Sequence, residues 1–111
     1  MLASVIVQAV REALSDTESP YRHSDAELLR YTSRALRELF ALHPESFWLD
    51  DFTVEPPEDV TATTDDIDSF DQQWTDAAVH HVCSKVLGSD AESEANRALA
   101  QYHWNLWKEE I

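Results

Sequence analysis

The chain has 111 residues, 43% of them hydrophobic, and contains one glycine and four prolines. This length supports one domain with a modest core, and the scarcity of glycine and proline favours helices over an all-β fold with many tight turns. The net charge of −14 disfavours non-specific binding to nucleic-acid phosphates, and the single cysteine, Cys83, excludes an internal disulfide.

The first predicted element is an amphipathic helix over residues 2–14. Its apolar residues recur at helical spacing, whereas Gln8, Arg11 and Glu12 fall on the other side. The apolar stretch has no basic segment before it and is too short to cross a bilayer, so we expect neither a secretory signal nor a membrane protein. A polar connector with Pro20 follows.

The second predicted helix starts at Ser24 and ends before Pro44. Ser24 is a favourable N-cap, and Glu27 stands three positions later, where its side chain reaches the N–H of the cap residue. One face of this helix carries Arg30, Arg34 and Arg37. This arginine face is either a solvated surface with local ion pairs, such as Arg34 with Glu38, or a contact with the acidic surface of a neighbouring copy.

Residues 45–70 carry nine acidic residues and no lysine or arginine. They also hold the aromatic residues Phe47, Trp48 and Phe52. Segments 52–55 and 60–63 flank Pro56 and Pro57, a pattern typical of a short hairpin. We therefore expect a long acidic loop or a short β-hairpin between the second and third helices, and such a connection in a small helical domain is usually functional.

The third predicted helix runs from about Asp71 to Leu87. Ser69 or Asp71 caps its start, and Gly88 is well placed to end it. Its wide apolar arc is typical of the most buried helix of a bundle. The predicted fold class is therefore mainly α, a small four-helix bundle.

The fourth helix is predicted to start at Ser89, with Glu92 completing a capping box. Two apolar stripes run along it: Ala95, Leu99, Tyr102 and Leu106 form the first, and Ala100, Trp104, Trp107 and Ile111 form the second. A bundle needs only one apolar face of each helix. We expect the second stripe to be spare and to bind a partner through Trp104, Trp107 and Ile111.

Two groups of residues resemble metal sites but lack the required pattern. His80 and Cys83 stand three positions apart and His103 follows on the next helix, whereas zinc sites usually have more cysteine and histidine at tighter spacing. The acidic run 65–68 lacks the glycine that an EF-hand loop requires.

The sequence also lacks the motifs of catalytic sites. One glycine cannot build a nucleophile elbow or a phosphate loop, and Cys83 on an apolar face should be inert. We expect no catalytic residue, no metal, no cofactor and no enzyme.

The balance of charges is also informative. The chain has 22 acidic residues, and its only lysines are Lys85 and Lys108. Such a composition suits a protein that works at high salt, where repulsion between carboxylates is screened. It equally suits an acidic surface that meets a basic partner, or one that lines a channel through which DNA slides.

The order of these parts resembles the head–tail adaptor (connector) proteins of tailed phages and related viruses. The early part of the match is Asp25, Glu27, Leu28, Leu29 and Arg30, and the late part is Ser89, Asp90, Ala91, Asn96, Arg97 and Ala100. The match covers most of the chain, and its motifs are structural. The chain departs from the family in its acidity, which fits a virus of a halophilic host, and in its short C-terminal segment.

The resemblance implies a virion structural protein of the neck between capsid and tail, which assembles in the host cytoplasm. Residues 1–111 would form a single domain and a homo-oligomeric, twelvefold ring between a portal protein and a tail or neck protein. DNA would pass through the ring without specific binding. Candidate interface residues are Trp104, Trp107, Ile111, Phe47, Trp48, Phe52, Arg30, Arg34 and Arg37. The alternative is an acidic helical interaction module, either a DNA mimic or an antitoxin-like binder of a basic partner.

Overall fold

The computed structural model describes residues 1–50, 53–89 and 93–111. Within these ranges lie α1 (Ala3–Ala13), α2 (Asp25–Leu42), β1 (Trp48–Asp50), β2 (Thr53–Val54), α3 (Thr75–Ser89) and α4 (Glu94–Glu110). Short 3-10 helices, Pro44–Ser46 and Gln72–Trp74, lead out of α2 and into α3. The prediction of a mainly helical bundle with a short hairpin between the second and third helices is confirmed.

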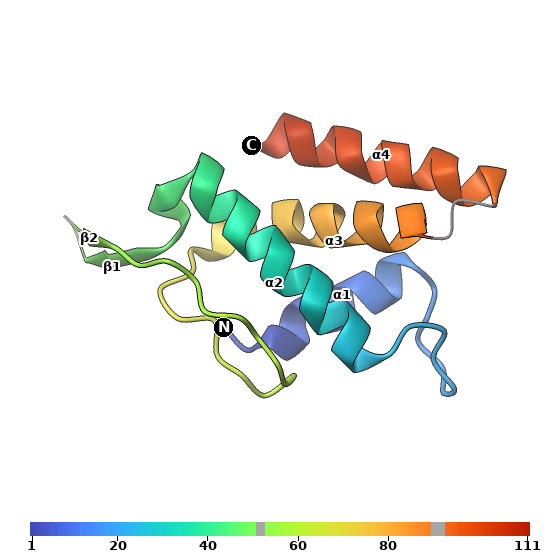
Figure 1. The fold of residues 1–111 in the computed structure, drawn as a ribbon, viewed down its shortest axis with the longest axis horizontal. Helices are drawn as coiled ribbons and strands as arrows, with labels where there is room; N and C mark the ends of the chain where they lie inside the picture. Colours follow the sequence, from blue (N-terminus) through green and yellow to red (C-terminus); the bar gives the residue numbers. More distant parts are fainter. Residues whose placement is uncertain (51–52, 90–92) are drawn as a thin grey trace.

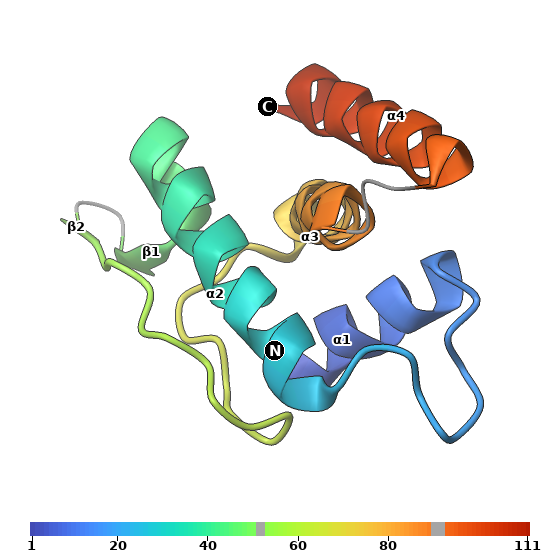
Figure 2. The same cartoon turned by 45° about the vertical axis from the view of Figure 1, so that its right-hand side comes forward.

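Helix α3 lies at the centre of the bundle. Figures 1 and 2 show α1 and α2 on one side of it and α4 on the other, with α4 antiparallel to α3. The residues of α3 are accordingly buried on both sides, among them Ala77, Ala78, Val82, Cys83 and Val86. A helix that is apolar over most of its circumference can be stable only in such a position, because any exposed side would place apolar surface in water.

Both ends of α1 are closed by backbone hydrogen bonds. At its start, the N–H groups of Ala3 and Ser4 donate to carbonyls of the 63–65 segment, at 2.8 and 2.9 Å. At its end, Ser15 takes a left-handed conformation with φ of 55°. The N–H of Asp16 then donates to the Arg11 carbonyl at 2.9 Å, as in a Schellman motif. This turn brings the side chain of Asp16 back towards α1.

The hairpin pairs earlier in the chain than predicted. Trp48 lies opposite Val54 and Asp50 opposite Thr53, whereas we predicted pairing between segments 52–55 and 60–63. Pro56 and Pro57 have no N–H group, so a strand cannot continue through them as a ladder partner. Phe52, a predicted interface residue, lies outside the described residues.

Part of the predicted hairpin packs onto α2 instead. Val60 is buried, and its N–H donates to the hydroxyl oxygen of Ser33 at 2.9 Å, while that hydroxyl lies 3.3 Å from the Val60 carbonyl. Ile67 and Phe70 are also buried. The acidic segment, residues 45–70, is therefore held on the core by these three side chains together with Phe47, and it is not a wholly solvated loop.

The connection between α3 and α4 also differs from the prediction. Helix α3 continues through Gly88 to Ser89, so Gly88 does not end it and Ser89 does not cap α4. The Ser89 hydroxyl donates to the Val86 carbonyl at 2.6 Å, a bond that a serine in the last turn of a helix makes readily. The N-cap of α4 is Ser93, whose hydroxyl accepts from the N–H of Asn96 at 3.3 Å. Glu92, predicted to complete the cap, lies outside the described residues.

None of the helices in the described ranges combines the length with the apolar character that crossing a membrane requires.

Candidate functional site

The arginine face of α2 is exposed, and its three members have different surroundings. Arg37 forms an ion pair with Asp59, which ties α2 to the acidic segment. The guanidinium groups of Arg30 and Arg34 lie 5.7 and 5.9 Å from the centre of the Tyr31 ring. These two cations therefore flank one aromatic ring on the surface, a geometry of weak cation–π contacts.

The two aromatic residues at the start of the hairpin have opposite positions. Phe47 is fully buried, and its ring packs against those of Phe40 and Phe70 at 6.1 and 5.2 Å between ring centres. Its prediction as an interface residue is wrong, because its backbone pairs with Phe70 and turns the ring into the core. Trp48 and Leu49 are 45% and 57% exposed and lie on the hairpin surface.

The two stripes of α4 are the reverse of the prediction. Trp107, expected on a spare face, is 1% exposed, and its ring stands edge-on to the ring of His81 at 4.8 Å. Trp104 and Ile111 are partly buried against the same core. Leu99 and Tyr102, expected in the core, are 48% and 57% exposed. The free apolar face of α4 is thus formed by Ala95, Leu99 and Tyr102.

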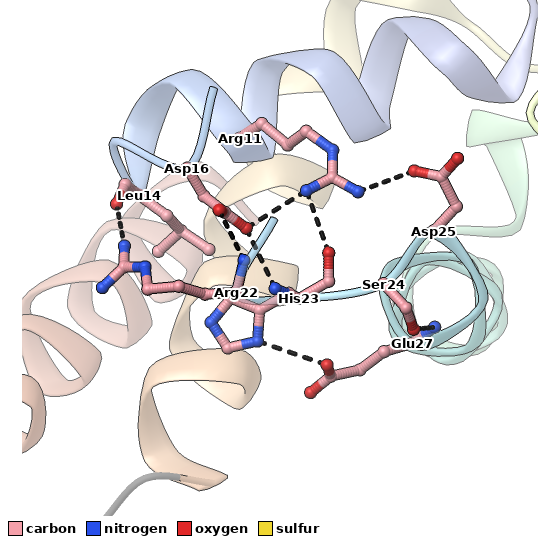
Figure 3. Close-up of polar contacts among 8 residues, drawn as sticks. All are labelled: Arg11, Leu14, Asp16, Arg22, His23, Ser24, Asp25 and Glu27. Atoms are coloured by element: carbon pink, nitrogen blue, oxygen red, sulfur yellow. Dashed lines mark hydrogen bonds and ion pairs between the residues drawn. The ribbon is translucent and has the colours of Figure 1, made fainter. Parts of the chain in front are cut away.

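Two buried charges that the sequence pattern had not indicated lie at the turn between α1 and α2. Arg11, predicted on the polar side of the first helix, is 3% exposed, and Asp16 is equally buried. The guanidinium of Arg11 donates to Asp16 at 3.1 Å, to the His23 carbonyl at 2.9 Å and to Asp25 at 2.6 Å (Figure 3). The Tyr21 ring covers it at 3.8 Å. Arg11 therefore joins the end of α1 to the start of α2.

The second charge of this cluster is also fully satisfied. The carboxylate of Asp16 accepts from the backbone N–H groups of Arg22 and His23, at 2.8 and 3.1 Å. Burial alone would raise the pKa of Asp16, but these hydrogen bonds and the charge of Arg11 outweigh it and lower the pKa. Helix α2 then begins at its N-cap Ser24, whose hydroxyl accepts from the Glu27 N–H at 3.1 Å. The Glu27 carboxylate lies 3.2 Å from the His23 ring rather than at the cap. Among the described residues, none of the buried side-chain nitrogen or oxygen atoms that lack a hydrogen-bond partner belongs to this cluster.

Histidines gather where α3 meets α4. The Nδ1 atoms of His80 and His103 lie 2.9 Å apart, and Nε2 of His80 is 3.4 Å from the carboxylate of Glu110. His81, on the neighbouring side of α3, is fully buried and donates from Nε2 to Glu38 of α2 at 2.6 Å. Glu38 is thus engaged by a histidine, although the sequence suggested Arg34 as its partner.

The residues weighed as metal ligands are not arranged for that purpose. Burial raises the pKa of the Cys83 thiol to about 12, so the sulfur is a protonated core atom at neutral pH. Asp65 uses its carboxylate to accept from the N–H groups of Thr61 and Ala62, at 2.8 and 3.1 Å. In the parts of the chain that the structure describes, no group of three or more His, Cys, Asp or Glu side chains is arranged to hold a metal ion.

The acidic segment encloses a pocket of about 270 Å³. Its lining includes six acidic residues: Glu55, Glu58, Asp59, Asp65, Asp66 and Asp68. Such a lining repels anions and attracts cationic groups. The pocket lies beside the ion pair between Asp59 and Arg37, so the acidic surface and the arginine face of α2 adjoin.

Comparisons of the chain with protein-family models, with curated proteins and with solved structures give no match.

Proposed function

We propose that this chain is a virion structural protein of the head–tail adaptor type, which forms a homo-oligomeric ring in the neck between the portal and the next tail component. The proposal starts from the sequence resemblance described above. Its main structural support is that, among the described residues, exposed apolar side chains lie on both the hairpin and α4. The role requires no catalysis and no cofactor.

The two surfaces belong to different elements. The hairpin surface is defined by Trp48 and Leu49, which are exposed on β1, and the α4 surface consists of Ala95, Leu99 and Tyr102. The hairpin and the start of α4 lie towards opposite ends of the molecule, whose longest dimension is 45 Å (Figure 1). A ring is built by heterologous contacts, in which one surface of each copy binds a different surface of the next. Two separated apolar surfaces meet this requirement.

The experiment uses one charged substitution on each surface. We expect the unaltered chain at high salt to form a closed oligomer by native mass spectrometry, and Trp48→Glu and Tyr102→Glu each to remain monomeric. An equimolar mixture of the two variants retains one intact pair of surfaces and should give a heterodimer. Gln8→Glu, a change of equal charge at an exposed position of α1, serves as the control and should assemble normally.

Two results would contradict the proposal. One is a chain that stays monomeric at every salt and protein concentration and never binds a portal protein. The other is a mixture of the two variants that behaves like either variant alone, because a heterologous contact must be restored by mixing.

The acidic pocket supports a second candidate, an interaction module that binds a basic partner. Six carboxylates line one pocket, of which Asp59 and Asp66 already pair with Arg37 and the N-terminal amine. The remaining four favour a ligand rich in arginine or lysine. Calorimetric titration with an arginine-rich peptide tests it, with Glu58→Gln and Asp68→Asn as variants. Saturable one-to-one binding that the variants weaken would favour this candidate. Weak binding that disappears at high salt without saturation would count against it.

A further inference from the structure

Two histidines face each other where α3 and α4 pack together. His80 of α3 and His103 of α4 face each other through their Nδ1 atoms at 2.9 Å. A hydrogen bond between two imidazole nitrogens needs one N–H and one lone pair, so at least one of the rings must be unprotonated at Nδ1. If both rings are protonated, two N–H groups and two positive charges face each other, and the hydrogen bond is lost.

The groups around the pair do not remove this conflict. On α4, Glu110 lies 3.4 Å from Nε2 of His80, and the ring of Tyr102 stands edge-on to His103 at 5.3 Å between ring centres. Burial raises the pKa of Glu110; the charge of His80 opposes this shift, and the charge of Asp76 on α3 adds to it. One carboxylate on the far side of His80 can stabilise one imidazolium, but His103 has no carboxylate contact among the described residues. Protonation of the second ring of the pair is therefore the step that destabilises the contact.

The neighbouring side of α3 holds another histidine that resists protonation. His81 donates from Nε2 to Glu38, and its buried Nδ1 has no partner in the described part of the chain. A second proton would leave a buried, unpaired N–H at Nδ1 of a ring that packs against Trp104 and Trp107. The charges that face His81 are Glu38 and Arg34 from α2 and Lys85 from α3.

Helix α4 is the element whose packing such protonation would affect. It packs mainly on α3, on the side opposite α1 and α2 (Figure 2). Loss of polar contacts in this one interface therefore leaves the packing of α1, α2 and α3 intact. We propose that the α3–α4 interface is a pH-sensitive joint, in which double protonation of the His80–His103 pair weakens the attachment of α4 and exposes the tryptophan-bearing face of that helix.

The direction of the pH dependence follows from proton linkage. Burial, and then the charge of His80, lower the pKa of His103 from its ordinary value of 6.5. Burial likewise lowers the pKa of His81, although Glu38 opposes the shift. A released histidine binds its proton at higher pH than the packed one, so the attachment of α4 is strongest above pH 6.5 and weakens as the pH falls below it.

One histidine near the end of α4 acts in the opposite direction. Nε2 of His43 lies 2.6 Å from the Ile111 carbonyl oxygen, and Nδ1 lies 2.8 Å from Glu45. The hydrogen bond with Glu45, and further the Ile111 carbonyl, raise the pKa of His43. Protonation strengthens both contacts, so the C-terminal end of α4 stays attached while the part that contains His103 loosens.

The test uses 5-fluorotryptophan labelling and fluorine NMR. Of the four tryptophans, Trp104 and Trp107 report on α4, and Trp48 on the hairpin is an internal control. Between about pH 7.5 and about pH 5.5, we expect the Trp104 and Trp107 signals to move or broaden, while Trp48 is unchanged. Corrected amide-exchange protection of α4 should fall by up to about tenfold per pH unit for each linked proton, and that of α1 should fall less.

Two variants separate the histidine pair from other causes. His103→Asn keeps a hydrogen-bonding group near Nδ1 of His80 but cannot take a charge, so it should abolish most of the pH response. His23→Asn alters a histidine at the α1–α2 turn and should respond like the unaltered chain. An unchanged response in His103→Asn, or immobile Trp104 and Trp107 signals in the unaltered chain, would overturn the proposal.

A measurement on the unaltered chain covers the case in which His103→Asn does not fold. Histidine nitrogen–proton correlation spectra at about pH 7.5 report which ring nitrogen carries each proton. The proposal requires one Nδ1–H tautomer in the His80–His103 pair. If both rings carry their proton only on Nε2, the Nδ1 contact is absent and the joint does not exist.

Discussion

Arg11 occupies a position on α1 that belongs to the core stripe, one residue after the buried Val10. Its charge is tolerated there because Asp16 neutralises it and because a backbone carbonyl, a second carboxylate and an aromatic ring take up the remaining guanidinium surface. A buried ion pair of this kind adds little net stability, because the attraction between the two ions is offset by the loss of their hydration. Because its contacts join the end of α1 to the start of α2, we expect the cluster to contribute to the specificity of their arrangement.

Removal of one partner of the Arg11–Asp16 ion pair should lower the free energy of unfolding by much more than the intact pair contributes to it. Arg11→Met leaves Asp16 buried without its cation, and we expect a loss of about 3–5 kcal/mol in the free energy of unfolding. Urea denaturation followed by circular dichroism measures it. Arg30→Met, the same substitution on the exposed face of α2, should change stability by less than about 0.5 kcal/mol. Equal losses in the two variants would show that the Arg11 cluster is not buried.

At the scale of elements, α4 shows how a helix start and a helix face are selected. Ser89 and Ser93 both precede residues able to complete a cap, but only Ser93 holds the N-cap position. The helix also has two apolar stripes, and the stripe that carries the tryptophans packs on α3. Large aromatic side chains bury the most apolar area, so the face that contains them is favoured in the core.

The cap assignment predicts different effects for the two serines. Ser93→Ala removes the hydroxyl that accepts from the Asn96 N–H and should destabilise the chain by about 1 kcal/mol. Ser89→Ala removes only a bond within the last turn of α3 and should change stability by less than about 0.5 kcal/mol. Thermal unfolding of both variants measures the two effects. A larger loss of stability in Ser89→Ala than in Ser93→Ala would contradict Ser93 as the N-cap of α4.

The choice of face on α4 predicts a second difference. Trp107→Ala opens a cavity against α3, for which we expect a loss of about 3–5 kcal/mol in the free energy of unfolding. Tyr102→Ala truncates an exposed ring and should cost less than about 0.5 kcal/mol in the isolated chain. Denaturant titration at a protein concentration that keeps the chain monomeric gives both values. Similar losses at the two positions would contradict the packing described for α4.

For the whole molecule, the net charge of −14 is the property that most affects how stability depends on salt. The acidic segment is packed on the core through Val60, Ile67 and Phe70, so its carboxylates are held close together whenever the chain is folded. Repulsion among them must be screened by salt. The Debye length falls from about 10 Å at 0.1 M to about 3 Å at 1 M, which is shorter than most spacings between surface charges.

Salt should therefore stabilise the folded chain. Raising NaCl from about 0.1 M to about 1 M should increase the melting temperature, and a gain of about 1 kcal/mol would correspond to about 4–8 °C. Sucrose at equal osmolality is the control, because it is excluded from the protein surface without screening charge. A melting temperature that is already maximal at low salt would contradict adaptation to high salt.

The sequence by itself determined the number, order and approximate limits of the helices, because apolar periodicity, caps such as Ser24 and breakers such as Pro44 act within a few residues. It also indicated a hairpin between α2 and α3, although not its register.

Only the tertiary structure decided which stripe of α4 is buried, why Arg11 lies inside, and that His80 and His103 meet. Each of these depends on a contact between residues far apart in the chain, and α4 has two apolar stripes of which α3 covers one.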